Sequence, residues 1–264
     1  MKEEDLSWIG LDYKNGHNLL NFVAFPSIKF DFIVHLAGIS DMNYSYLHPF
    51  ETINTNFQIT LNVLEKARLD KSMVIFPSTC LVYNPKKAKV AEIDDLSPRD
   101  PYSFSKKVCE DLVLFYSKTF TIPVAILRLF NVYGKFLKEN TLFYDVIKQI
   151  QDEKTITVNI LNNASFRDYI HIDDVVNIFV QIINSRIDGV FNIGSGKGYK
   201  PKEIAQLIMN TLGIRKEIEI SDPSVIEEFL ISENSSIEKK LKYSSRISIL
   251  DGIKELIQLY SREM

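Results

Sequence analysis

The pair of residues best suited to proton chemistry in this chain is Tyr102 and Lys106, which stand four positions apart. In a helix this spacing places a phenol and an ammonium on the same face. A neighbouring cation favours the phenolate, so the lysine is expected to lower the pKa of the tyrosine and make it a base near neutral pH. Such a pair is typical of proton transfer coupled to oxidation or reduction of an alcohol.

Spacing alone does not single out this pair, because Tyr83 with Lys87 and Tyr144 with Lys148 have it too. Tyr83 is followed two positions later by a proline, which favours a turn rather than a helix face. Tyr144 lies in an amphipathic segment, where an ordinary surface pair is expected. The sequence around each pair is therefore needed to decide which of the three is the catalytic candidate.

Context favours Tyr102, which follows Pro101, a natural first residue of a helix. Upstream, Thr79 closes a short apolar run that predicts a strand. In an open parallel sheet, ligands bind beyond the carboxyl ends of the strands. The Thr79 hydroxyl is therefore expected to hydrogen-bond a substrate oxygen or the phenol. The alternative is that Tyr102 and Lys106 are only a structural pair on a helix.

The elements that must position these residues alternate between apolar runs and amphipathic segments. The apolar runs predict strands over 30–36, 73–76, 124–130 and 189–193, and the main amphipathic segments predict helices over 50–69, 102–118 and 173–185. Further helices are predicted near 141–152, 202–212, 235–241 and 249–262. This alternation predicts an α/β fold, with a doubly wound, Rossmann-like parallel sheet and helices on both faces.

Composition sets the broad class of protein. The chain has 264 residues, 45% of them hydrophobic and 25% charged, as in an ordinary globular protein. A formal net charge of -3 gives no electrostatic case for nucleic acid or an anionic membrane as partner. No signal peptide or membrane span is visible, so a cytoplasmic protein is expected. Cys80 and Cys109 cannot form a disulfide framework, and without a Cys/His cluster at ligand spacing no metal is expected.

Further segments follow one another in a characteristic order between residues 30 and about 200. Together with Tyr102 and Lys106 they resemble the extended short-chain dehydrogenase/reductase superfamily, in its NAD-dependent nucleotide-sugar epimerase/dehydratase branch (UDP-glucose 4-epimerase-like). The segments that carry this resemblance are His35-Leu36-Ala37-Gly38, Asn56 with Thr60, Pro77-Ser78-Thr79 with Val82-Tyr83, Pro101 to Lys106, Arg128 to Gly134, Arg167 to Asp174 and Phe191 to Gly196.

The resemblance implies a catalytic set and a cofactor, NAD or NADP. Tyr102 would move the proton of a sugar hydroxyl while hydride passes to or from the nicotinamide. Lys106 would lower the pKa of the tyrosine and hold the nicotinamide ribose. Thr79 would orient the sugar hydroxyl of a nucleotide-sugar substrate.

The resemblance also implies binding residues. Those expected at the cofactor, mostly through backbone groups, are Ala37, Gly38, Asn56 and Phe130, beside Tyr102 and Lys106. Those expected at the substrate are Thr79, Cys80, Asn131 and Arg167, the last two near the diphosphate because arginine offers a fork of donors. Alternatives stay open for two of them: Asn131 closing a turn, and Arg167 forming a local ion pair with Asp168.

One departure from the branch narrows the chemistry. Dehydratases of this branch carry an acidic pair directly after the catalytic threonine, where this chain has Cys80 and Leu81. Without that acid and base, dehydration is disfavoured. Oxidation and reduction at a sugar hydroxyl remains, as in 4-epimerases and ketoreductases.

A second departure concerns the glycine-rich turn that binds the dinucleotide phosphates. Before Gly38 the only glycines are Gly10 and Gly16, so the Rossmann-like domain is expected to be incomplete at its N-terminus. The loop 194–198 is a weak alternative site for a phosphate. A replacement strand is expected over 8–13 or 19–25; otherwise, 8–12 is a remnant strand and 17–25 a short helix.

Two hypotheses about function follow. The chain is a nucleotide-sugar epimerase or oxidoreductase, or it is an inactive or truncated relative that keeps the fold and binds a nucleotide sugar or a protein partner. A second copy of the chain is a candidate partner. Residues 1–134 and 166–196 are expected to form the Rossmann-like domain, and residues 135–165 and 197–264 the substrate-binding subdomain.

Overall fold

The computed structural model describes residues 7–86, 88–137, 139, 141–152, 154–155, 157–161, 163–222, 227–242 and 244–260. The chain divides into two compact units. Unit 1 comprises Met1–Asn84, Glu92–Leu129 and Phe179–Phe191, and unit 2 comprises Pro85–Ala91, Phe130–Ile178 and Asn192–Met264.

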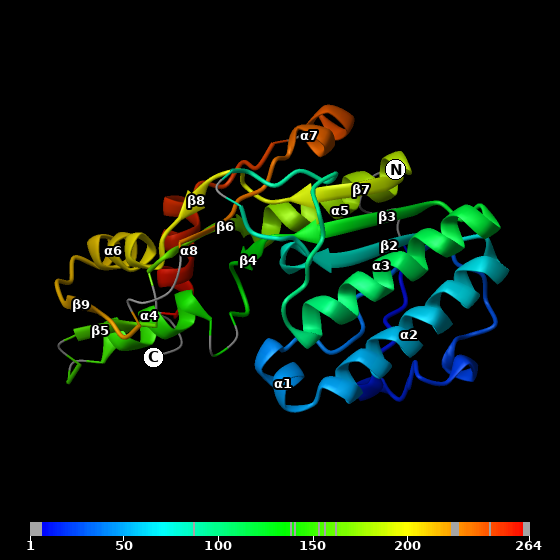
Figure 1. Ribbon diagram of the computed structural model, residues 1–264, viewed down its shortest axis with the longest axis horizontal. Coiled ribbons are helices and arrows are strands. Elements are labelled where there is room, and N and C mark those ends of the chain that lie inside the picture. The colour runs from blue at the N-terminus through cyan, green and yellow to red at the C-terminus, as the bar shows by residue number, and fades with distance from the viewer. Residues whose placement is uncertain are drawn as a thin grey trace. The chain divides into compact units, whose positions relative to one another are not determined.

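Unit 1 is built on a four-stranded sheet (Figure 1). Its strands, in spatial order, are β1 (Phe32–Val34), β2 (Met73–Thr79), β3 (Val124–Leu129) and β7 (Gly189–Ile193). The β1–β2 and β2–β3 pairs are parallel. Every residue of β2 is buried, as expected for an apolar strand inside a parallel sheet. The predicted parallel α/β fold is confirmed.

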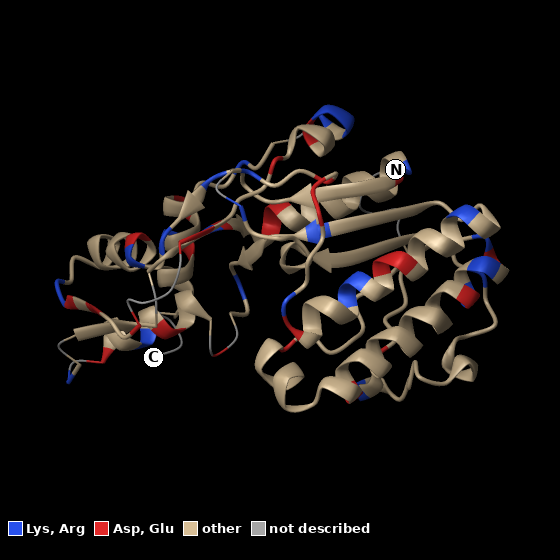
Figure 2. Cartoon of the chain, in the orientation of Figure 1, with Lys and Arg blue, Asp and Glu red and all other residues tan. Residues whose placement is uncertain are grey.

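Two long helices of unit 1 pack against one another and against this sheet. They are α2 (Pro49–Asp70) and α3 (Pro101–Phe120), preceded by the short α1 (Met42–Leu47). Buried side chains of both helices, such as Leu64 and Val113, share a core cluster with Val74 and Phe76 of β2. Figure 2 shows basic and acidic residues alternating along α3.

The start of α3 fixes where Tyr102 lies, and local signals explain it. Asp100 is the N-cap: its carboxylate accepts a hydrogen bond from the Ser103 backbone N–H at 2.8 Å, and the Ser103 side chain reaches back to the Asp100 N–H. Pro101 occupies the first turn, where a missing N–H costs nothing. The helix ends at Thr121, which has a left-handed φ of 57°.

The segment before β1 corrects both expectations for the N-terminus. Among the described residues before β1 there are two 3-10 turns, Tyr13–Asn15 and Phe22–Ala24, and neither a strand nor an α-helix. Buried polar side chains of α2 hold the segment: Asn62 Nδ2 donates to the carbonyls of Leu19 and Leu20, and Lys66 Nζ to that of Ile28. Carbonyl groups used in this way are not available to a sheet ladder.

Unit 2 has its own core, formed by three helices and small sheets. The helices are α4 (Leu142–Gln151), α6 (Pro201–Leu212) and α8 (Ile249–Tyr260), and their buried side chains form one cluster with Val158, Ile160 and Tyr169. The sheets are β10-β6-β4, with β8 on β6, and the pair β5-β9. Their bounds are β4 (Asn131–Tyr133), β5 (Thr157–Ile160), β6 (Ser165–His171), β8 (Gly198–Tyr199), β9 (Glu217–Ile220) and β10 (Glu228–Leu230).

The remaining helices are α5 (Ile172–Ser185) and α7 (Ser235–Leu241). All seven helices expected from the sequence are found in the described residues, while α1 and the short strands of unit 2 were not expected. The predicted end of the last helix at 262 lies outside the described residues. None of the helices in the described part of the chain combines the length and the apolar character needed to cross a membrane.

Candidate functional site

Thr79 and Tyr102 meet in unit 1, as expected from the rule that places sites at strand ends. Thr79 is the last residue of β2, and Tyr102 lies in the first turn of α3. The Thr79 hydroxyl lies close enough to the phenol of Tyr102 to act on its pKa. The same hydroxyl oxygen accepts a hydrogen bond from the Leu81 backbone N–H at 3.2 Å, which fixes its orientation.

The protonation state of Tyr102 differs from the expectation. Burial raises the pKa of Tyr102 to about 12, and nearby Cys80 acts in the same direction, while the hydrogen bond with Thr79 acts to lower it. Desolvation disfavours the charged phenolate. The expected lowering of this pKa by Lys106 is therefore not found, and Tyr102 is a protonated phenol at neutral pH.

Lys106 lies one helical turn after Tyr102, with its ammonium over the face of the Phe76 ring, 4.5 Å from the centroid. Burial lowers the pKa of Lys106 to about 8, while Cys109 and Glu110 act to raise it. Within the described part of the chain no hydrogen bond or ion pair of Lys106 is found. Its three N–H donors are therefore available to a ligand.

Gly38 and Asn56 shape the loop that follows β1. Gly38 has φ of 144°, and a Cβ there would lie 2.8 Å from Asn56 Oδ1, so only glycine fits. Asn56 Oδ1 accepts from the Ile39 N–H at 2.7 Å, and its Nδ2 donates to the Ile39 carbonyl and to Ser105 Oγ, both at 2.9 Å. Asn56 thus joins this loop to α3, and its polar atoms are already bonded to protein.

Two further residues expected at the site, Ala37 and Cys80, pack against the interior of unit 1. Ala37 is half-buried against the cluster of Leu19, Ile59 and Val63. Cys80 follows Thr79 in a 3-10 turn, is 3% exposed, and lies close enough to Tyr102 to raise its pKa. This placement agrees with a small side chain that packs beside the site.

The site residues Phe130, Asn131 and Arg167 belong to unit 2. Phe130 is buried, and its N–H donates to the Ile193 carbonyl at 2.9 Å, so only its backbone carbonyl remains for a ligand. Asn131 lies in β4 rather than in a turn, and its Nδ2 donates to the Asp168 carbonyl at 3.0 Å. The alternative of a turn-closing Asn131 is wrong.

The alternative of an ion pair between Arg167 and Asp168 is also wrong. Arg167 Nη2 faces Glu228 Oε2 at 3.4 Å, across the paired strands β6 and β10, and its buried Nη1 has no hydrogen-bond partner. Asp168 instead accepts from Ser195, Gly196 and Ser232.

These bonds to Asp168 explain the glycine-containing loop 194–198. The backbone N–H groups of Ser195 and Gly196 donate to the carboxylate of Asp168 at 2.7 and 2.9 Å, and the hydroxyls of Ser195 and Ser232 donate to it as well. An internal carboxylate thus occupies the donors that a phosphate would need. The N–H groups of Ser195 and Gly196 are therefore already used inside the protein.

Unit 2 also contains an open pocket of about 250 Å³. Its wall is partly apolar, with amide side chains at the edge. The lining residues are Leu142, Asp145, Val146, Gln149, Asn159, Ile160, Leu161, Tyr169 and Pro201.

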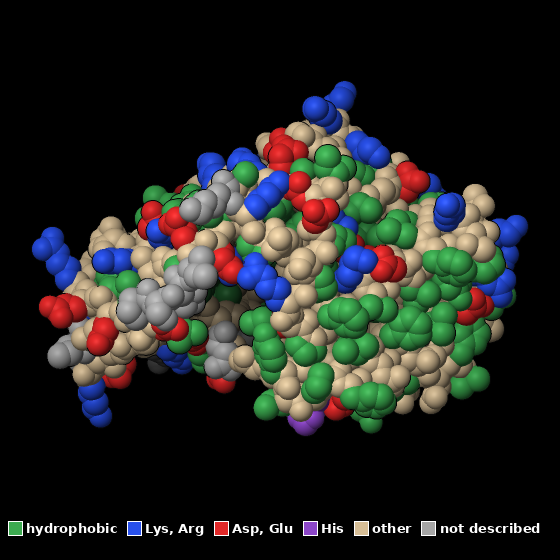
Figure 3. Space-filling model, viewed as in Figure 1, with side chains coloured by type: hydrophobic (Ala, Val, Ile, Leu, Met, Phe, Trp, Pro, Cys, Tyr) green, Lys and Arg blue, Asp and Glu red, His purple; other side chains and the backbone are tan. Residues whose placement is uncertain are grey.

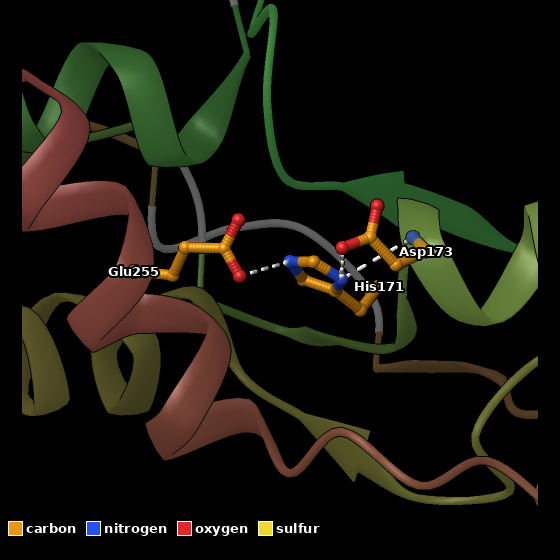
Figure 4. A group of neighbouring side chains, drawn as sticks. All are labelled: His171, Asp173 and Glu255. Carbon is orange, nitrogen blue, oxygen red and sulfur yellow. Dashed lines mark hydrogen bonds and ion pairs between the residues drawn. The ribbon is translucent and has the colours of Figure 1, made fainter.

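A cluster of His171, Asp173 and Glu255 in unit 2 has the side chains of a metal site (Figure 4). However, the Asp173 backbone N–H donates to His171 Nδ1 at 3.3 Å, and Lys135 Nζ lies 3.5 Å from both carboxylates. His171 Nε2 is buried, lies 3.6 Å from Glu255 Oε2 and has no hydrogen-bond partner in the described part of the chain. The lysine already supplies a cation to the two carboxylates, so this donor set fits a metal ion poorly.

The chain matches the model of a known protein family. The model of the NAD dependent epimerase/dehydratase family matches residues 1–194, about three quarters of the chain. The chain belongs to this family.

Individual relatives are similar over most of the chain. The uncharacterized UDP-glucose epimerase YtcB of Bacillus subtilis is 30% identical over 92% of this chain and 83% of its own length. UDP-arabinose 4-epimerase 1 of Arabidopsis thaliana is 27% identical, and the chain covers 59% of that longer protein.

Solved structures show the same fold. The UDP-glucuronic acid 4-epimerase of Bacillus cereus, in complex with UDP-glucuronic acid and NAD, is 28% identical with a TM-score of 0.79, over 87% of this chain and 76% of that one. RMD from Pseudomonas aeruginosa, complexed with NADPH, has a TM-score of 0.87 at 20% identity over 94% and 88% of the two chains. That second likeness is one of fold alone.

Two polar residues near Lys106, His35 and Glu110, were not predicted from the sequence to lie there. His35, at the end of β1, is buried, and its Nε2 lies 2.9 Å from Thr60 Oγ1. Glu110 is buried on α3 and pairs with Arg128. The spacing of four between Lys106 and Glu110 is the signal that could have identified Glu110.

Proposed function

We propose that this chain is an NAD(P)-dependent nucleotide-sugar epimerase that acts at a sugar hydroxyl, as 4-epimerases do. The observation that carries the proposal is the placement of Thr79, at the end of β2, beside Tyr102, in the first turn of α3 and one helical turn from a lysine with unused donors. Family membership and the 4-epimerase names of the relatives support it.

Each catalytic residue has a separate task in this proposal. Thr79 and Tyr102 together bind the sugar hydroxyl, and Tyr102 takes up its proton and later returns it. A nicotinamide dinucleotide, when bound, supplies reversible exchange of hydride with the sugar carbon. A phenol whose pKa is about 12 is a poor base at neutral pH, so the Lys106 ammonium has to favour the phenolate once ligands exclude water from the site.

The residues of unit 1 fit the nicotinamide ribose better than the phosphates. Lys106 offers free donors, and the loop of Ala37 and Gly38 lets a ligand approach its backbone. On the phosphate side, the described residues before β1 contain no strand, glycine turn and helix in succession. Gly16 ends a 3-10 turn with φ of 90°. NAD or NADP is thus proposed, with weak binding by this chain alone.

Unit 2 is proposed to bind the nucleotide sugar. Arg167 has a buried Nη1 without a partner, a group suited to a diphosphate oxygen. The pocket beside α4 and β5 offers apolar walls for a base. Asn131 and Cys80 complete the proposed contacts. The expected domains, 1–134 with 166–196 and 135–165 with 197–264, are bounded differently from the two units: they assign Asn131 and Arg167, like Cys80 of unit 1, to the Rossmann-like domain.

A homodimer through the outer face of α2 and α3 is part of the proposal. Figure 3 shows hydrophobic side chains gathered over these helices. The exposed ones include Phe57, Leu69, Phe104, Leu114, Phe115 and Phe120. Exposed apolar patches on helices are typical of interfaces. Light scattering should give the mass of a dimer; a monomer at micromolar concentration would contradict this part.

Calorimetric titration with NAD and NADP, followed by assays with UDP-sugars, tests the function. Tyr102→Phe should lower turnover by about 10²–10⁴-fold and leave cofactor affinity largely unchanged. The matched control is Tyr144→Phe, which alters another tyrosine four residues before a lysine, on the surface of α4. Absence of saturable cofactor binding, or full turnover in Tyr102→Phe, would contradict the proposal.

A further inference from the structure

Glu110 is a fully buried carboxylate near the catalytic set that has no part in the chemistry proposed above. It lies on α3, four positions after Lys106, and is 1% exposed. Side chains at this spacing lie on the same face of a helix. A charge buried there needs a partner and hydrogen bonds.

Arg128 of β3 supplies them. Its Nη2 and Nε donate to Glu110 Oε2 at 2.8 and 3.2 Å, and Nε also lies 3.2 Å from Oε1. Arg128 Nη1 donates to the Tyr83 hydroxyl at 2.8 Å and to the Glu92 carbonyl at 3.1 Å. The guanidinium is therefore held on several sides, and it fixes the carboxylate and this turn of α3 against the sheet.

Stability alone does not account for this pair. An apolar pair of similar volume at a buried site is often as stable as an ion pair, because both charges lose their hydration. The placement of the charge next to Lys106 suggests another use for it.

The groups around Lys106 indicate how the charge of Glu110 acts on it. Lys106 lies on α3 over the Phe76 ring of β2, and Cys109, Glu110 and His35 lie close enough to interact with its charge. Burial lowers the pKa of Lys106 to about 8, while Cys109 and then Glu110 act to raise it. Of these two groups Glu110 is the carboxylate, and Arg128 holds it in place. Burial, with the nearby charge of Lys106, lowers the pKa of His35 to about 3, so this imidazole is neutral and supplies no counter-charge.

We propose that Glu110, fixed by Arg128, is a positioning residue that keeps Lys106 charged and directed toward the ligand site. This inference rests on the proposed function, in which Lys106 acts on Tyr102 as a charged ammonium. The neighbouring pair Lys107–Asp111 has the same spacing and a distance of 2.6 Å, but its Asp111 side chain is 62% exposed. Water screens that pair, so it offers a matched control.

The test measures the charge of Lys106 directly, without cofactor or substrate. The full chain is treated with a small amine-acylating reagent between pH 6 and about 10, and the modification of Lys106 is followed by peptide mass spectrometry. Only the neutral amine reacts, so the midpoint of the pH profile reports its pKa. In Glu110→Gln the midpoint should fall by about one unit, a roughly tenfold rise in reactivity at neutral pH. Asp111→Asn should leave it unchanged.

Two further variants keep the inference falsifiable. Glu110→Asp retains the charge and should restore the midpoint toward that of the original chain. If Glu110→Gln does not fold, the double variant Glu110→Gln/Arg128→Met removes both charges and should still lower the midpoint. An unchanged midpoint in a folded variant that lacks the carboxylate overturns the inference. An original chain without activity, but with the expected midpoints, would count against the proposed function alone.

Discussion

The Thr79 hydroxyl lies beside the Tyr102 phenol, where the end of β2 meets the start of α3, and acts to lower the pKa of that phenol. The Thr79 oxygen also accepts a hydrogen bond from the Leu81 N–H at 3.2 Å, which limits the orientation of the hydroxyl. A hydroxyl oxygen has two lone pairs and one hydrogen, so Thr79 can still hydrogen-bond the phenol or a substrate oxygen. The two hydroxyl groups therefore form a pair that can bind an incoming hydroxyl or carbonyl group.

Replacing Thr79 by valine should remove this orientation while keeping the shape of the side chain. Turnover should fall by roughly 10- to 100-fold, because an oriented donor at the reacting oxygen is lost. The pKa of Tyr102, already about 12, should rise further, since the hydrogen bond with Thr79 acts to lower it. Spectrophotometric titration of the phenolate, corrected with Tyr102→Phe, checks the second point. Thr79→Ser should retain most activity; an equal loss in both variants would contradict a role for the hydroxyl.

The loop after β1 should tolerate no side chain at position 38. Gly38→Ala would strain a φ of 144° and bring a methyl group within 2.8 Å of Asn56 Oδ1. The free energy of unfolding should fall by about 2–3 kcal/mol. Gly16→Ala is the matched control: φ is 90°, but nothing lies within 4 Å, so a loss of only about 1 kcal/mol is expected. Urea unfolding measures both, and equal losses would show that the contact with Asn56 is unimportant.

Local signals predicted the helix that carries Tyr102 and Lys106, and long-range contacts account for what was missed. The start of α3 follows from Asp100, Pro101 and Ser103, which are adjacent in the sequence. The partner of Arg167 is Glu228, 61 residues away, and spacing along the chain cannot reveal it. The raised pKa of Tyr102 is similar, because it comes from burial rather than from the neighbouring Lys106.

Replacing the Asp168 carboxylate should destabilise unit 2. Its carboxylate accepts hydrogen bonds from Ser195, Gly196 and Ser232, and it is completely buried. Asp168→Asn removes the charge and places an amide N–H against these donors, so the free energy of unfolding should fall by about 2–4 kcal/mol. Asp152→Asn changes a surface carboxylate that also accepts from two neighbours, Lys154 and Thr155, and should cost less than about 1 kcal/mol. A small loss in Asp168→Asn would mean that the loop 194–198 is held by other contacts.

His35 should make stability depend on pH. Burial, together with the nearby charge of Lys106, lowers the pKa of His35 to about 3 from the usual 6.5. The folded state then binds fewer protons than the unfolded state between these two values. The contribution is fully present above pH 6.5 and is lost as the pH falls toward 3, with a slope of up to about 1.4 kcal/mol per pH unit. His35→Gln, which keeps a donor for Thr60, should show a weaker pH dependence in urea unfolding at pH 4.5 to about 7. Parallel pH profiles for the two proteins would show that folding does not lower the pKa of His35.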